Sequence, residues 1–96
     1  IMKWVEQIIL RSSSESLQEL DIDSVIALAN MNRTPRPNHI KVYKHGSLET
    51  DLSVFLCWAT EQQEPLGSPV ARHISQQLSN FGLVNSSWWI ETLDVA

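Results

Sequence analysis

Apolar and polar positions alternate along parts of this chain in a way that predicts four β-strands. The most informative stretch is Leu52-Ser53-Val54-Phe55-Leu56-Cys57-Trp58-Ala59, in which seven of eight side chains are apolar. It is too short to span a membrane and rich in β-formers, so residues 52–60 are expected to form a central strand that is covered on both faces. The other strands are expected at 3–10, 39–45 and 84–93. In the first of them, Trp4, Ile8 and Leu10 share one face.

A first helix is expected between the first two strands, where Ser12-Ser13-Ser14-Glu15 resembles a capping box. The helix should continue to about Met31. Its apolar residues fall on two nearly opposite sides, so it is either widely buried or broken near Asp21-Ile22-Asp23. The break is the preferred interpretation, with Asp23 capping the second piece.

The second helix has clearer boundaries. Ser68 is a typical cap, Pro69 suits the first helical position, and Gly82 is expected to end the helix in a left-handed conformation. Apolar residues follow Pro69 at helical spacing: Val70, Ile74, Leu78 and Phe81. Residues 34–38, 46–51 and 61–67 are polar or contain proline, and are expected to be connections.

The resulting order, β-α-β-β-α-β, predicts a single α+β domain over residues 1–96. Right-handed crossovers give a ferredoxin-like plait: a four-stranded antiparallel sheet in the order 4-1-3-2, with two helices on one face. The third strand then lies in the middle, as its apolar character requires. The opposite face of the sheet is left open.

In element order and size, this arrangement resembles the dimeric α/β-barrel domains, which include antibiotic-biosynthesis-type monooxygenases. The resemblance covers the whole chain but rests on no sequence motif. It implies a homodimer formed through the open sheet face. It also implies, as an alternative, a cofactor-independent monooxygenase-like enzyme whose pocket binds an aromatic substrate.

Composition narrows the classes of partner. The chain is 43% apolar and 19% charged, with a net charge of −4, and this balance disfavours a nucleic-acid partner. Four of its seven cations lie between Arg33 and His45; Lys41 and Lys44 there are typical of a protected edge strand. No apolar run is long enough for a membrane span and no signal-peptide pattern is visible. With Cys57 as the single cysteine, we expect a cytoplasmic protein.

Six residues are candidates for a ligand site or an interface. Trp88 and Trp89 are adjacent on a strand and must point to opposite faces, so they cannot both serve the core. Tyr43 and His45 share one side of the second strand, which is expected to be the open side. Trp58 and Asn85 complete the set. A dimer interface is favoured over a pocket for a small aromatic or apolar ligand, because a large apolar sheet patch is rarely left in water.

No catalytic constellation is recognisable, so the sequence leaves the question of enzymatic activity open. The histidines at 39, 45 and 73 have no partner at metal-ligand spacing, and we expect neither a metal site nor a cofactor. Two functions remain: a homodimeric interaction or small-ligand-binding module, and the monooxygenase-like enzyme. A roomy cavity with a tryptophan and convergent polar groups would favour the enzyme, whereas a solidly packed interior would favour the module.

Overall fold

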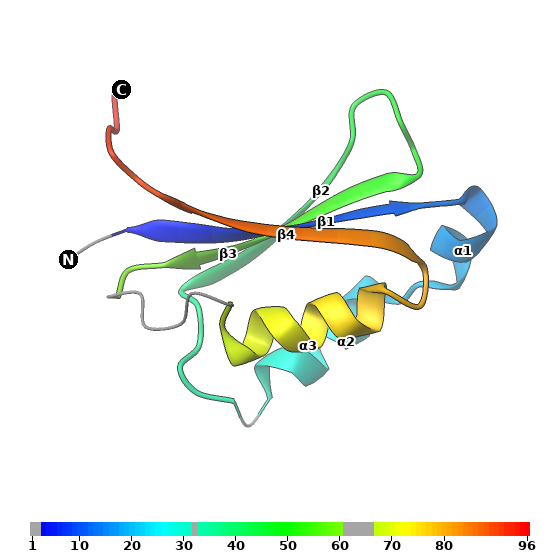
Figure 1. Ribbon diagram of the computed structural model, residues 1–96, viewed down its shortest axis with the longest axis horizontal. Helices are drawn as coiled ribbons and strands as arrows, with labels where there is room; N and C mark the ends of the chain where they lie inside the picture. Colours follow the sequence, from blue (N-terminus) through cyan, green and yellow to red (C-terminus); the bar gives the residue numbers. More distant parts are fainter. Residues whose placement is uncertain (1–2, 32, 61–66) are drawn as a thin grey trace.

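A computed structural model describes residues 3–31, 33–60 and 67–96 and has an α+β architecture. A four-stranded antiparallel sheet is accompanied by three helices (Figure 1). In chain order the elements are β1 (Trp4–Ser12), α1 (Ser14–Glu19), α2 (Ile22–Asn30), β2 (His39–Lys44), β3 (Asp51–Trp58), α3 (Pro69–Leu78) and β4 (Gly82–Ile90).

The strands follow the order β2-β3-β1-β4 across the sheet. Read from the β4 edge, this is 4-1-3-2. The central position of β3 is confirmed, since it pairs with β1 on one side and with β2 on the other. The prediction that the lysine-bearing β2 is an edge strand is also confirmed. The sheet is compatible with a ferredoxin-like plait, although three helices replace the expected two.

The two faces of the sheet differ in cover. Figure 1 shows the sheet nearly edge-on, with α2 and α3 side by side beneath one face. We call this the helix face and the opposite one the open face. Alternate residues of β1 and β3 point to the helix face and form most of the core, because successive side chains of a strand alternate between faces. The core contains Trp4, Ile8, Leu10, Ala29, Leu52, Val54, Leu56, Trp58, Val70, Ala71, Ile74 and Leu78.

The predicted break of the first helix is confirmed. The segment divides into α1, which begins after the cap residue Ser13, and α2. The cap of α2 is Asp21, so the assignment of this role to Asp23 was wrong. Asp21 Oδ1 accepts the backbone N–H of Ser24 at 3.2 Å, and Oδ2 accepts the Ser24 hydroxyl at 2.7 Å. These bonds lower the pKa of Asp21, because they stabilise its ionised form.

The start of α3 agrees with the prediction made from the sequence, but its end does not. Ser68 is the N-cap and Pro69 occupies the first turn, as predicted. Gly82 does not end the helix: α3 stops at Leu78, and Gly82 is the first residue of β4. Glycine is needed there for a different reason. A Cβ atom would collide with the carbonyl oxygen of Arg11 on the paired strand.

Two further sequence expectations concern the connection before α3 and membrane-spanning helices. The polar connection expected at 61–67 lies outside the described residues except for Gly67. Among the residues that are described, no helix combines the length and apolar character required to cross a bilayer.

The close approach at Gly82 gives a test of the β1–β4 pairing. Replacing Gly82 with Ala should lower the free energy of unfolding by about 1–3 kcal/mol, because the strands must separate to admit the methyl group. Gly46→Ala is the matched control, since a Cβ atom at Gly46 meets nothing within 4 Å. Chemical denaturation measures both. Equal stability of the two variants would contradict the packing described at Gly82.

Candidate functional site

A buried carboxylate connects the sheet to the start of α3. Glu6, on β1, is only 3% exposed. Its Oε1 accepts the Trp58 indole N–H at 2.7 Å and the Ser68 hydroxyl at 2.6 Å, and its Oε2 accepts the Ser68 backbone N–H at 2.8 Å. The Ser68 hydroxyl oxygen in turn accepts the N–H of Ala71. Three elements are therefore joined through one side chain.

The carboxylate is well placed electrostatically because it lies at the amino end of α3, where the helix dipole favours negative charge. The residue before Ser68, Gly67, has a φ of +100°. Glycine adopts this conformation without steric cost, and a Cβ atom there would approach Glu6 Oε2 to 3.4 Å. The chain thus turns tightly against the carboxylate before the helix begins.

Sequence reasoning did not identify Glu6 as a key residue. The available signal was its position: it shares the face of β1 that carries Trp4, Ile8 and Leu10. A carboxylate on the apolar face of a strand must find hydrogen-bond donors, since burying it without partners is costly. Nothing in the local sequence indicates that Ser68, 62 residues away, supplies two of them.

Trp58, one of the six candidates, is a core residue. It is 3% exposed, and its ring stacks on Trp4 with centroids 5.2 Å apart and an interplanar angle of 8°. The Trp4 indole N–H donates to the carbonyl oxygen of Thr60 at 2.8 Å. Trp58 lies on the helix face because β3 alternates and its even-numbered residues point inward. It therefore cannot contribute to a contact on the open face.

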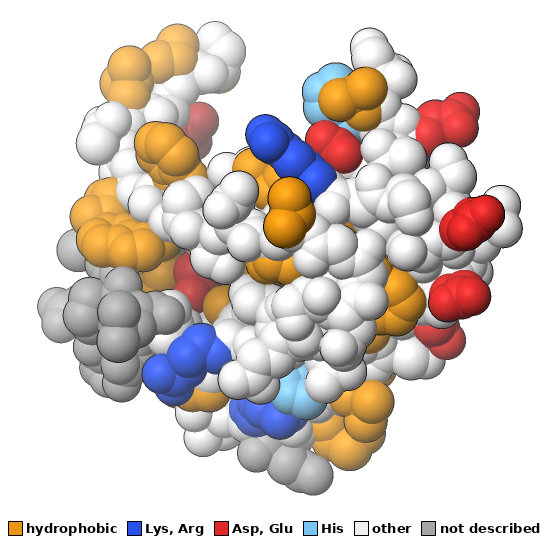
Figure 2. All heavy atoms as spheres, turned by 45° about the vertical axis from the view of Figure 1, so that its right-hand side comes forward, with side chains coloured by type: hydrophobic (Ala, Val, Ile, Leu, Met, Phe, Trp, Pro, Cys, Tyr) orange, Lys and Arg blue, Asp and Glu red, His pale blue; other side chains and the backbone are white. Residues whose placement is uncertain are grey.

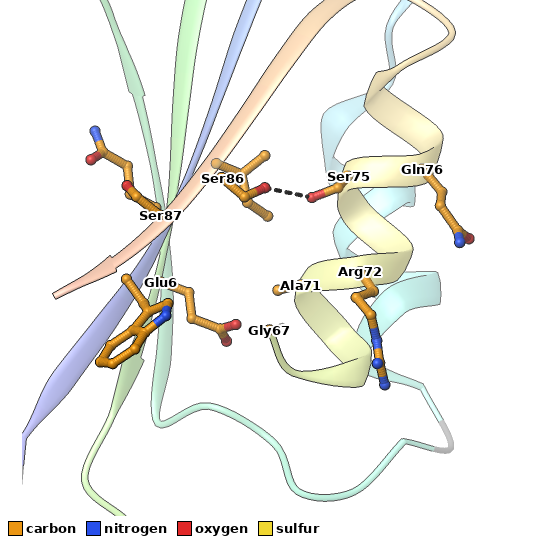
Figure 3. Close-up of a pocket in the computed structure, with 11 residues that line it drawn as sticks. Glu6, Gly67, Ala71, Arg72, Ser75, Gln76, Ser86 and Ser87 are labelled. Carbon is orange, nitrogen blue, oxygen red and sulfur yellow. Dashed lines mark hydrogen bonds between the residues drawn. The ribbon is translucent and has the colours of Figure 1, made fainter. Parts of the chain in front are cut away.

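A cleft lies on the helix face, between α3 and the β1–β4 pair. Its volume is about 630 Å³. Figure 3 shows Glu6 directed toward Gly67 at one end and Ser75 facing Ser86 across it, with their hydroxyl oxygens 3.1 Å apart. Trp88 also lines the cleft and is 40% exposed. A tryptophan and several polar groups therefore converge on one concave surface.

The open face carries a diagonal band of apolar side chains. In the strand register, Val5 lies opposite Trp89 on β4 and opposite Cys57 on β3. Phe55 follows on the same side of β3, and its ring meets Tyr43 of β2 edge-on at 5.4 Å. We call Trp89, Val5, Cys57, Phe55 and Tyr43 the open-face band. Trp89 and Tyr43, at its two ends, are 60% and 51% exposed.

The open face is hollowed between two raised ends of the molecule. In Figure 1 the C-terminal segment and the β2–β3 hairpin both rise on this side, and Figure 2 shows the depression between them. Near the hairpin, a hollow of about 570 Å³ is lined by Ile9, Tyr43, His45 and Ser53, among others. Tyr43 and His45 therefore line the same open-face hollow.

His45 also has a structural task at the hairpin. Its Nδ1 accepts the backbone N–H groups of Ser47 and Leu48, each at 3.0 Å. The imidazole thus stabilises the turn that follows β2. Tyr43 has no comparable constraint on its hydroxyl among the hydrogen bonds of the described residues, so it is the freer of the two to contact a partner.

The remaining candidates divide between the two faces. Trp88 lies opposite Glu6 on the helix face, whereas Trp89 lies opposite Val5 on the open face, so the expectation that they point in opposite directions is confirmed. Asn85 is an exposed open-face residue of β4, opposite Ile9. The six candidates therefore belong to the core, the cleft and the open face rather than to one site.

The described residues contain no group of three or more metal-ligating side chains arranged to hold an ion. His73 Nδ1 lies 3.0 Å from a guanidinium nitrogen of Arg33, and it must act as the acceptor because arginine only donates. His39 lies opposite Cys57 in the register, a proximity that their separation in sequence conceals.

Comparison with known proteins does not assign the chain. No family model matches it, and neither the curated proteins nor the solved structures yielded a match.

The Glu6 network predicts a large stability effect from a single substitution. Glu6→Ala should lower the free energy of unfolding by about 3 kcal/mol or more, because it leaves the Trp58 and Ser68 donors buried without an acceptor. Gln7→Ala, on the adjacent open-face residue, should have a much smaller effect. Thermal unfolding followed by circular dichroism measures both, and equal losses would argue against the network.

Proposed function

We propose that this domain is a self-associating interaction module, in which the open sheet face of one copy packs against that of another. The observation that carries the proposal is the open-face band. It crosses all four strands, from Trp89 on β4 to Tyr43 on β2, on a face over which no described helix lies. The solvated face of an antiparallel sheet is commonly polar, whereas this band of apolar side chains runs between polar residues such as Gln7 and Lys41.

Two exposed aromatic rings favour self-association energetically. Trp89 and Tyr43 leave about half or more of their surface in water. Fully burying a large apolar side chain is worth about 1.5–3 kcal/mol, and tryptophan and tyrosine are enriched in interfaces. Contact with a second copy would cover both rings in each protomer, so four rings in the dimer would contribute to the free energy of association.

Self-association through the open face also agrees with a likeness to the dimeric α/β-barrel domains. A ferredoxin-like plait with one uncovered face is the architecture that the dimeric α/β-barrel domains use to associate. The element order and strand order support this likeness. It adds the expectation that the contact is symmetric, with the same band contributed by both copies.

A charged residue in the band should disrupt the assembly. In sedimentation velocity at tens of micromolar, the unmodified chain should have at least twice its 10.9 kDa mass. Tyr43→Lys should raise the dissociation constant of the open-face contact at least tenfold, because each copy would lose a buried ring and bring a second ammonium group next to Lys41 into the contact.

Val42→Lys is the matched control. Val42 is exposed on the same strand but points to the helix face, so the same change there should leave the open-face contact intact. A monomeric unmodified chain, or equal effects of the two lysines at equal thermal stability, would overturn the proposal.

A second candidate function, small-ligand binding, is favoured by the cleft between α3 and the β1–β4 pair. Its volume is within the range of small-molecule sites. Trp88 offers a flat apolar surface, and Ser75 and Ser86 offer hydroxyl groups. The fitting ligand is a small planar molecule with a hydrogen-bonding edge. The monooxygenase-like alternative requires this binding as its first step.

Indole is a suitable probe for this second candidate. In nuclear magnetic resonance titrations, millimolar indole should shift the amide signals of Ser86 and Trp88, and Trp88→Ala should abolish these shifts. Trp89→Ala is the control, since Trp89 lies on the other face. Shifts confined to Tyr43 and Trp89 would place the ligand on the open face instead, and the absence of any shift would reject binding of this class of ligand.

A further inference from the structure

The two edges of the sheet are protected very differently. At one edge, β2 has six residues, two of which are Lys41 and Lys44. At the other edge, β4 has nine residues with the sequence GLVNSSWWI, and none is charged or a proline. In the described part of the chain, β4 pairs only with β1, so its outer edge presents unpaired backbone groups. Sheet proteins normally protect such an edge with lysine, proline or a bulge.

The order of side chains along β4 makes the strand complementary to itself. Its polar residues, Asn85, Ser86 and Ser87, are central, and its apolar residues are at both ends. If two copies pair antiparallel about Ser86, Leu83 meets Trp89 of the other copy on the open face. Val84 meets the other copy's Trp88 on the helix face, and Asn85 meets its Ser87. Apolar residues thus face apolar residues and polar residues face polar ones.

We propose that the outer edge of β4 binds the same edge of a second copy of this chain, joining two four-stranded sheets into one continuous sheet. Where Ser75 contacts Ser86, the side of α3 that lines the cleft carries the uncharged Ser75 and Gln76, and Arg72 follows one turn toward the start of the helix. The assembly is also closed. Both β4 edges are used, and the two remaining outer edges are β2 strands protected by Lys41 and Lys44.

Pairing of the two β4 edges would also cover part of the cleft. Trp88 and Ser86 lie on the helix face of β4 and line the cleft. In the proposed register, Val84 of the second copy covers the exposed side of Trp88, so each copy completes the rim of the other's cleft. The pairing goes beyond the open-face contact and uses a different surface. The two can be tested separately.

An engineered disulfide tests the register. In a Cys57→Ser background, Ser86→Cys should form an interchain disulfide under mild oxidation, because residues directly opposite on antiparallel strands have Cβ atoms about 4.5–5.5 Å apart. Ser87→Cys is the control. In the proposed register it faces Asn85 of the other copy, and diagonal neighbours lie about 7–8 Å apart. Face-to-face packing gives no reason for the Ser86→Cys variant to cross-link, since Ser86 is on the helix face.

A doubled mass on a non-reducing gel for Ser86→Cys but not for Ser87→Cys would establish the pairing. Cross-linking of neither variant, of both equally, or of Ser87→Cys alone would overturn it. A second measurement avoids oxidation: Ser86→Lys should halve the mass of the edge-paired species, since two ammonium groups meet on the symmetry axis, whereas Ser86→Thr should not.

The double variant separates this proposal from the open-face contact. Tyr43→Lys should leave an edge-paired dimer, Ser86→Lys should leave an open-face dimer, and the combination should be monomeric. An unchanged mass for Ser86→Lys would overturn the edge pairing alone, and an unchanged mass for Tyr43→Lys would overturn the open-face contact alone.

Discussion

The interaction on which the rest of the structure depends is the hydrogen bonding of the buried Glu6 carboxylate. Removing a carboxylate from water is unfavourable unless donors replace the lost solvent, and here Trp58 and both donor groups of Ser68 do so. The requirement fixes the amino end of α3 against the central strands. The aromatic stack of Trp4 on Trp58 lies beside it, so the start of the helix and the end of β3 are held together.

Once α3 is fixed in this way, the surfaces follow. The helix lies close to β4, where Ser75 reaches Ser86, and the space between this point and Glu6 becomes the cleft. The helices cover one face of the sheet, and the buried apolar residues of β1 and β3 point to that face. The residues of opposite parity, including Val5 and Phe55, are left on the open face. One arrangement of a helix thus creates both a cleft in which polar groups lie beside Trp88 and an open face that keeps an apolar band.

Most of the fold could be predicted from the sequence because its signals are local. The apolar run of β3 and the Ser68-Pro69 pair are contained within a few residues, and both were interpreted correctly. One error is local: Asp21 rather than Asp23 caps α2. The other errors concern residues whose role depends on distant parts of the chain. Gly82 is required by the backbone of Arg11 rather than by a helix terminus, and the buried indole N–H of Trp58 has its acceptor on another strand, at Glu6. That Trp88 and Trp89 point to opposite faces of the sheet could be predicted from strand alternation alone.

The hydrogen bonds of Glu6 also limit the chemistry that this residue itself can perform. A general base needs a lone pair that can reach the substrate, but this carboxylate is 3% exposed and already accepts three hydrogen bonds. Its geometry is that of a structural group. The groups that line the two surfaces include Trp89 and Tyr43 with Lys41 on the open face, and Trp88 with Arg72 and the serines in the cleft. Aromatic rings with a polar edge suit the binding of flat apolar surfaces, and both proposed functions depend on this property.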